Sequence, residues 1–304
     1  MTADAIRAES LTKYYGAVVA VEGLDLAVMP GEVYGFLGPN GAGKTTTIRM
    51  LLDLVRPTRG RILVHGLDCR TSSLAVRSRI GYLPAEMPLY RELTGGGYLD
   101  FLGALQKTAV DPKWRRRLLA RFDVSDTDLG RRLGDLSHGM KRKFGIVQAL
   151  MGRASVIVLD EPTSGLDPLM IEAFAETVHE LKAEGSTTIF LSSHVLSEVE
   201  RLCDRVGIIR RGTLVRQTSI ADLRQETPRR VRIFFEGPAP EPPPALAAAL
   251  TRRGPRRWDL EWRGPLGHAL DAMRGLGVAD IEIEPFRLEE YVLGIYAEGS
   301  EPRH

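Results

Sequence analysis

The sequence predicts an α/β fold in two parts, a large layered domain over residues 1–227 and a small α+β domain over residues 228–304. Three observations lead to this prediction. Short apolar runs alternate with helical patterns through most of the chain. Residues 156–159 are four consecutive apolar β-formers, which is typical of a parallel strand buried on both faces. The composition changes at Thr227 and Pro228, after which prolines become frequent.

The large domain begins with short strands and turns and then becomes mainly helical. From about residue 86 to 150, apolar residues recur at helical spacing, as in Leu99, Leu102 and Leu105. Strand–helix alternation then resumes and predicts a parallel sheet. Further strands are expected at residues 18–26, 32–37, 61–64, 79–83, 187–191 and 206–209, and helices at 46–54, 171–182 and 198–202.

The small domain mixes strands and helices. Its proline-rich residues 237–244 are expected to form a surface loop, with a disordered linker as the alternative. Strands are expected at residues 231–235, 258–262 and 281–283, and helices at 245–250, 266–276 and 289–296.

Composition excludes several classes of protein. The 304 residues are 43% hydrophobic and 26% charged, which is ordinary for a globular protein, and the net charge of +2 argues against a dedicated nucleic-acid binder. No apolar run reaches 18 residues, and the first residues lack the pattern of a secretory signal. Cys69 and Cys203 are too few for a disulfide framework or a zinc site.

Three basic clusters at residues 115–117, 131–132 and 141–143 suggest contacts with anionic lipid or nucleic acid. Acidic residues close by in the sequence offset them. We therefore expect these clusters to be solvated helix faces.

A glycine-rich loop carries the strongest functional signal. It fits the pattern Gly-x4-Gly-Lys-Thr between an expected strand and an expected helix. Glycines let successive backbone N–H groups converge on phosphate oxygens, and the helix directs the positive end of its dipole at the same anion. Lys44 is expected to reach the β- and γ-phosphates, and the Thr45 hydroxyl to bind Mg²⁺. The nucleotide-binding loop comprises Gly38, Pro39, Asn40, Gly41, Ala42, Gly43, Lys44, Thr45 and Thr46.

The base of the nucleotide follows from what the sequence lacks. GTPases typically recognise guanine through an Asn-Lys-x-Asp motif, and the one asparagine of this chain is Asn40, inside the loop. ATP is therefore the expected nucleotide.

Two acids follow the apolar strand at residues 156–159, where ligands bind in parallel sheets. Asp160 is expected to hold Mg²⁺, directly or through water. Glu161 is placed to orient and deprotonate the attacking water.

A further motif lies between the loop and these acids. In Leu136-Ser137-His138-Gly139-Met140, Ser137 is a good helix N-cap and Gly139 allows an anion to approach the helix end. In this order and spacing, the segment resembles the signature motif of ABC-type ATPases, whose usual form is Leu-Ser-Gly-Gly-Gln.

The resemblance to ABC-type ATPases extends over residues 5–225 and assigns further residues. It implies that Tyr15 stacks on adenine, that Asp167, in Ser-Gly-Leu-Asp, belongs to a loop contacting a partner subunit, and that His194 contacts the γ-phosphate. It implies catalytic roles for Glu161, His194 and Lys44. The implied fold is a P-loop NTPase nucleotide-binding domain with a parallel-sheet core, an N-terminal antiparallel β subdomain and a helical subdomain.

Two departures from the family pattern affect the mechanism. His138 and Met140 replace a glycine and the glutamine of the signature motif. Ala85 stands where the family carries a glutamine that touches Mg²⁺ and couples to the membrane partner, and Glu86 follows it. An alanine cannot ligate a metal, so we expect slower or less tightly coupled hydrolysis.

The resemblance also implies partners. The signature motif of one subunit faces the phosphate loop of another, and the chain has one set of motifs, so a homodimer enclosing two ATP molecules is expected. The membrane-spanning permease subunits are expected on another chain, with this protein peripheral at the cytoplasmic face of the membrane.

The C-terminal segment resembles those of bacterial exporter ATPases for drugs, antibiotics or lipids. Export is therefore the expected activity, and no nucleic-acid partner is expected. The alternatives are an importer ATPase, or a soluble ABC ATPase acting on ribosomes or DNA.

Overall fold

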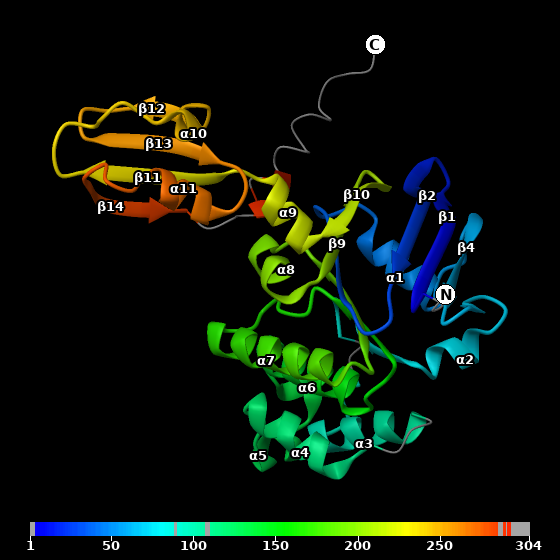
Figure 1. Cartoon of the computed structure of the whole chain (residues 1–304). Helices are drawn as coiled ribbons and strands as arrows, with labels where there is room; N and C mark the ends of the chain where they lie inside the picture. The colour runs from blue at the N-terminus through cyan, green and yellow to red at the C-terminus, as the bar shows by residue number, and fades with distance from the viewer. Residues whose placement is uncertain (1–3, 88–89, 107–109, 285–287, 290, 293–304) are drawn as a thin grey trace. The chain divides into compact units, whose positions relative to one another are not determined.

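The computed structural model describes residues 4–87, 90–106, 110–284, 288–289 and 291–292. The chain divides into two compact units, Met1–Gln217 and Thr218–His304 (Figure 1). The sequence places this boundary at Thr227, and the difference is helix α9 (Ile220–Glu226), which groups with the second unit.

A six-stranded sheet forms the centre of the first unit. Its strand order is β10-β9-β3-β8-β7-β6, and the strands from β9 to β6 run parallel to their neighbours. All residues of β3, β7 and β8 are buried, as the apolar runs of the sequence predict. The segments that follow these parallel strands therefore meet at one edge of the sheet. The strands are β10 (Thr213–Ser219), β9 (Arg205–Arg210), β3 (Val33–Leu37), β8 (Thr188–Ser193), β7 (Val156–Asp160) and β6 (Ile80–Leu83).

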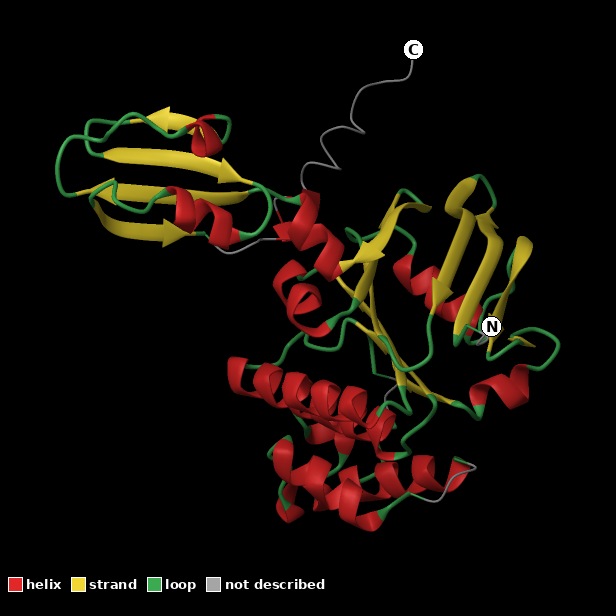
Figure 2. Cartoon of the chain, in the orientation of Figure 1, coloured by secondary structure: helices red, strands yellow, loops and turns green. Residues whose placement is uncertain are grey.

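A second, antiparallel sheet lies at the N-terminal side of the chain. Its order is β2-β1-β4-β5, and it is the antiparallel β subdomain that the resemblance implies (Figure 2). Sequence periodicity did not predict β1, whose pairing with β2 is interrupted by bulges that break the alternation of apolar residues. The strands are β1 (Ile6–Tyr15), β2 (Val18–Val28), β4 (Arg59–Val64) and β5 (Leu67–Asp68).

Helices pack on the central sheet and form a helical layer of their own. Helix α6 begins at its N-cap Ser137, as predicted, and packs against β6 and β7. Helices α3 to α6 gather in the lower part of Figure 1. The helices of this unit are α1 (Lys44–Leu51), α2 (Ser73–Arg77), α3 (Gly95–Leu105), α4 (Pro112–Arg121), α5 (Asp126–Gly130), the 3-10 helix η1 (Leu133–Asp135), α6 (His138–Met151), α7 (Pro168–Glu184) and α8 (Leu196–Leu202).

The prediction that residues 141–143 form a solvated face is wrong for the middle residue. Arg142 is 1% exposed, whereas Lys143 reaches Asp123 at the surface. Arg142 lies one helical turn before the buried Ile146, so the helix places it on its inward face. The structure agrees better with the expectation for the clusters at residues 115–117 and 131–132, in which Arg115 and Arg131 form ion pairs with acidic residues.

The second unit is a four-stranded antiparallel sheet of order β12-β13-β11-β14 with its own apolar core, which includes the fully buried Trp258. Its elements after α9 are β11 (Arg229–Phe235), α10 (Pro244–Ala247), β12 (Leu250–Arg253), β13 (Arg257–Trp262), α11 (Leu266–Ala272) and β14 (Val278–Ile283).

The prediction of a helix over residues 245–250 is wrong at its C-terminal end. The helix ends at Ala247 as α10, because Leu250 pairs with Leu260 and begins a strand. Residues 288–289 and 291–292 are helical, and the rest of the predicted last helix lies outside the described residues. Within the described part of the chain, no helix combines the length and apolar character needed to cross a bilayer.

Candidate functional site

The glycine-rich loop connects β3 to α1, as the sequence predicts. Two of its glycines are required by their surroundings, since a Cβ at Gly38 would lie 2.4 Å from the Ile209 carbonyl oxygen and one at Gly43 would lie 2.5 Å from that of Ala20. Gly43 also has a φ of 110° and is the N-cap of α1. The loop therefore passes close to neighbouring backbone and enters the helix directly.

Lys44 is the first residue of α1 and is almost fully buried. Its ammonium donates to the carbonyl oxygens of Gly38 at 2.6 Å and Pro39 at 3.3 Å. Its Nζ also lies 3.3 Å from Oε1 of Glu161. A cation at the positive end of the helix dipole favours the binding of an anion at this point.

A cavity of about 400 Å³ lies over the loop and brings together most of the predicted nucleotide-binding residues. Glu161 and Ala85 line it from the ends of neighbouring strands. Gly38 and Ala42 of the loop are buried and do not line it. The other lining residues are Tyr15, Val18, Val19, Ala20, Pro39, Asn40, Gly41, Gly43, Lys44, Thr45 and Thr46.

Tyr15 offers an aromatic surface at one side of this cavity. It ends strand β1 and is 45% exposed, and the Nζ of Lys13 lies 4.9 Å from its ring centroid. An exposed ring with a cation beside it suits stacking against a nucleotide base.

Asp160 is the last residue of β7 and has no exposed surface. Its Oδ1 accepts a hydrogen bond from the Ser192 hydroxyl at 2.5 Å. Its Oδ2 is buried and has no hydrogen-bond partner among the described residues. A buried carboxylate oxygen without a partner is costly unless another group satisfies it.

Glu161 follows with a φ of 52°, a left-handed backbone conformation that is unusual for a residue other than glycine. Its N–H donates to the carbonyl oxygen of Ser192 at 3.1 Å and to the Ser192 hydroxyl at 3.2 Å. Its Oε2 lies 2.6 Å from Nδ1 of His194, while Oε1 faces Lys44. The structure thus brings together the three residues predicted to be catalytic.

Glu198, in the first turn of α8, was not among the predicted site residues. Its Oε2 accepts a hydrogen bond of 2.6 Å from the Thr163 hydroxyl. Burial raises the pKa of the Glu198 carboxyl, and the negative charge of Glu161 raises it further. The signal in the sequence is its position four residues after His194.

The remaining predicted site residues lie elsewhere. Ser137, Gly139 and Asp167 do not line the cavity. Ser137 and Asp167 act as N-caps of α6 and α7, accepting from the N–H groups of residues 140 and 170. Both are exposed, and the imidazole of His138 packs against Gly165, where a Cβ would lie 2.8 Å from its Cδ2.

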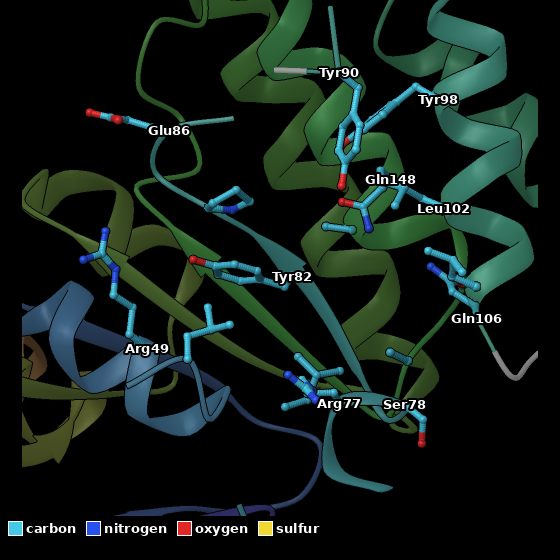
Figure 3. A pocket seen from close by; sticks show the side chains of 17 residues that line it. Arg49, Arg77, Ser78, Tyr82, Glu86, Tyr90, Tyr98, Leu102, Gln106 and Gln148 are labelled. Carbon is cyan, nitrogen blue, oxygen red and sulfur yellow. The ribbon is translucent and has the colours of Figure 1, made fainter. Parts of the chain in front are cut away.

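A second cavity, of about 500 Å³, lies between α1, β6, α3 and α6 (Figure 3). Tyr82 stands near its centre, with Arg49 on one side and Tyr90 and Gln148 on the other. Glu86 lines this cavity together with Pro84, whereas Ala85 lines the first one. The segment 84–86 therefore borders both cavities.

Comparison with known proteins finds one family throughout. The family model described as ABC transporter matches residues 21–164. The chain is similar to the bacitracin transport ATP-binding protein BcrA of Bacillus licheniformis, with 38% identity over 224 residues that cover 72% of this chain and 71% of BcrA. It is similar to the daunorubicin resistance ATP-binding protein DrrA3 of Streptomyces coeruleorubidus, with 39% identity over 230 residues that cover 75% and 72%. Among solved structures, the ATP-binding subunit of an ABC transporter matches with a TM-score of 0.67 and 32% identity, covering 73% of this chain and 92% of that one.

Proposed function

Because the chain belongs to the ATP-binding proteins of the ABC transporter family, we propose that the cavity at Lys44 and Glu161 hydrolyses ATP to power export through separate membrane subunits. Membership confirms the family resemblance, the fold class and the ATP-binding function predicted from the sequence. The observation that carries the proposed site is the Glu161 carboxylate, which lines a nucleotide-sized cavity and contacts both Lys44 and His194.

The loop and Tyr15 bind the nucleotide in this proposal. The backbone of residues 38–46 and the Lys44 ammonium hold the phosphates, and the Tyr15 ring stacks on adenine. Glu161 accepts the proton of the attacking water at its carboxylate, and His194 fixes the direction of that carboxylate through Nδ1.

The donors near the loop fit a magnesium ion. Asp160 has a buried oxygen without a described partner, and Thr45, which carries a hydroxyl, lines the cavity. No group of three or more His, Cys, Asp or Glu side chains among the described residues is arranged for a metal, which suits an ion that takes further ligands from the phosphates. Bound Mg²⁺ would neutralise charge on the phosphates, and Thr45 and Asp160 would hold it.

Replacing Glu161 tests the proposed chemistry. Glu161→Gln keeps the shape of the side chain but removes the proton acceptor, so kcat for phosphate release should fall about 10²- to 10⁴-fold. The dissociation constant for ATP should change little, since the loop is intact. Glu176→Gln, on the exposed face of α7, is the control and should behave as wild type. Turnover of Glu161→Gln at the wild-type rate would refute the assignment.

The working unit in this proposal is a homodimer. Ser137, Gly139 and Asp167 lie outside the cavity of their own chain, and Ser137 and Asp167 are exposed. A second copy would bring its α6 N-terminus to the phosphates bound by the first, with two ATP molecules between the chains. Residues 1–227 would then form the nucleotide-binding domain, with residues 86–150 as its helical subdomain and 228–304 as an accessory domain.

The second cavity is the proposed contact with the membrane subunits. Its lining combines the Tyr82, Tyr90 and Tyr98 rings with polar groups, a surface that suits an inserted segment of another protein. Its border at residues 84–86 also lies next to the ATP cavity. Movement of this segment would connect ATP turnover to the membrane subunits, and the protein would act at the cytoplasmic face of the membrane.

The exported substrate is proposed from the relatives. Their names concern bacitracin and daunorubicin, which favours an antibiotic as substrate and export over import. Co-purification of Glu161→Gln with ATP from native membranes separates the alternatives. An integral membrane protein is the expected companion, whereas ribosomes or DNA would overturn the transport proposal.

A further inference from the structure

Arg142 is a buried cation whose hydrogen bonds, within the described part of the chain, go to backbone carbonyl groups and not to carboxylates. Its side chain is 1% exposed in the interior of α6, and no carboxylate among the described residues forms an ion pair with it. Burial lowers the pKa of the guanidinium to about 10. Charges are rarely buried in this way unless their hydrogen-bonding groups are satisfied.

Backbone carbonyl groups satisfy Arg142, and they come from two segments. Nη1 donates to Pro84 at 2.6 Å and to Ala85 at 3.1 Å. Nε donates to Pro162 at 3.1 Å, and Nη2 donates to Asp160 at 2.7 Å and also to Glu161. The Asp160 carbonyl group belongs to the last residue of β7, and the other four follow β7 or its parallel neighbour β6 directly. One planar guanidinium therefore ties α6 to the ends of both strands.

These bonds fix the backbone that carries the proposed catalytic carboxylate. Ser192 holds the N–H of Glu161, and Arg142 holds its carbonyl group, so both peptide groups flanking this strained residue are restrained. The direction of the Glu161 side chain depends on those two peptide planes. The two lysines next to Arg142 in the sequence make no such contacts. Lys141 donates to the carbonyl oxygen of Gly134, and Lys143 forms an ion pair with Asp123.

We propose that Arg142 is a positioning residue for ATP hydrolysis, coupling the Ser137 end of α6 and the segment at Ala85 to the placement of Glu161. Ser137 lies five residues earlier on the same helix, so contact of a second copy at that end acts on a rigid element that Arg142 ties to the catalytic backbone. The Ala85 side chain has no group that could take part in this coupling, but the backbone carbonyl group of Ala85 accepts a hydrogen bond from Arg142. The inference rests on the proposed function and adds this route to it.

The variant Arg142→Lys tests the role because it keeps the charge but loses the fork that reaches both segments. We expect kcat for phosphate release to fall about 10- to 100-fold, with KM for ATP within about threefold of wild type, because a small displacement of a reacting group costs rate more than binding. Phe144→Leu is the matched control, since Phe144 is also fully buried in α6 but makes none of these bonds.

A double variant separates positioning from general destabilisation. If Arg142 acts through Glu161, then Arg142→Lys should have no further effect on the residual hydrolysis of Glu161→Gln. A multiplicative loss, a kcat within twofold of wild type, or an equal loss in Phe144→Leu would overturn the inference. Should the lysine variant not fold, Arg142→Gln, which keeps one pair of donors, carries the same comparison. A normal rate in Glu161→Gln alone would instead refute the proposed function.

Discussion

Glu161 combines strain with function at the residue scale. A non-glycine residue at a φ of 52° costs about 1–3 kcal/mol, and hydrogen bonds from Arg142 and to Ser192 hold it there. This conformation turns the carboxylate back toward Lys44 and His194 across the cavity edge. In the proposed mechanism, the strained backbone positions the carboxylate that accepts the proton of water.

We predict that the rate of hydrolysis can be raised by a substitution at Ala85. Ala85 lines the ATP cavity at a place where the family carries a metal-contacting glutamine, and its methyl group cannot ligate or donate. We predict that Ala85→Gln raises kcat for phosphate release, or the stimulation of kcat by the membrane subunits, about three- to tenfold, equivalent to about 0.7–1.4 kcal/mol.

The control for Ala85→Gln is Ala85→Leu, which adds bulk without a polar group. Phosphate release is measured for each variant with the purified chain and after reconstitution with the membrane subunits. Equal rates and equal coupling in the glutamine variant and wild type would contradict the assigned role of this position.

Residue identities at the site were predictable because each motif has a fixed chemistry. Lys44, Asp160 and Glu161 lie where the loop and the apolar strand place them. Arg142 was not predictable, because a basic run between other lysines has the composition of a solvated face, and only tertiary packing reveals the carbonyl groups that surround it. Glu198 was not predicted, because the Thr163 hydroxyl that donates to it lies far away in the sequence.

At the scale of elements, α6 contributes both to the stability of the fold and to the proposed site. Its N-terminus carries the exposed Ser137, and its inward face carries Arg142 and packs on β6 and β7. Ser137 caps the helix by accepting from the N–H of Met140 at 3.2 Å. One serine thus stabilises the fold and is the proposed contact with ATP on a second copy.

Substitution of Ser137 should separate its capping of α6 from its proposed contact with ATP on a second copy. Ser137→Ala removes the cap and should lower the free energy of unfolding by about 1 kcal/mol in denaturant titrations. Ser137→Asn keeps an N-cap acceptor and should restore most of that stability. The alanine and asparagine variants should both weaken ATP-dependent association of the chain, and full association in either would contradict the contact proposed for Ser137.

Helices and strands with strong local sequence signals were predicted, and those that depend on pairing with a distant strand of the same chain were not. The buried run of β7 and the capped start of α6 are evident in the sequence. Leu250, the first residue of strand β12, was expected to be the last residue of a helix, because the pairing of β12 with β13 cannot be read from the four residues Leu250–Arg253 alone.

At the scale of the whole molecule, the proposed function requires two copies of the chain. The proposed ATP cavity is lined by residues of the phosphate loop, Tyr15 and Glu161, while the exposed Ser137 and Asp167 lie outside it. The second unit has a separate core around Trp258. Two copies related head to tail would complete two cavities, which makes ATP the link between association and turnover.

The most direct test is the mass of the Glu161→Gln variant, measured by light scattering after gel filtration with and without Mg²⁺ and ATP. We predict a monomer without ATP and a dimer with two ATP molecules bound per dimer, because the variant binds ATP but cannot hydrolyse it. Lys44→Ala in the same background is the control and should remain monomeric, since it lacks the phosphate-binding ammonium. A Glu161→Gln chain that binds ATP and stays monomeric would contradict the account.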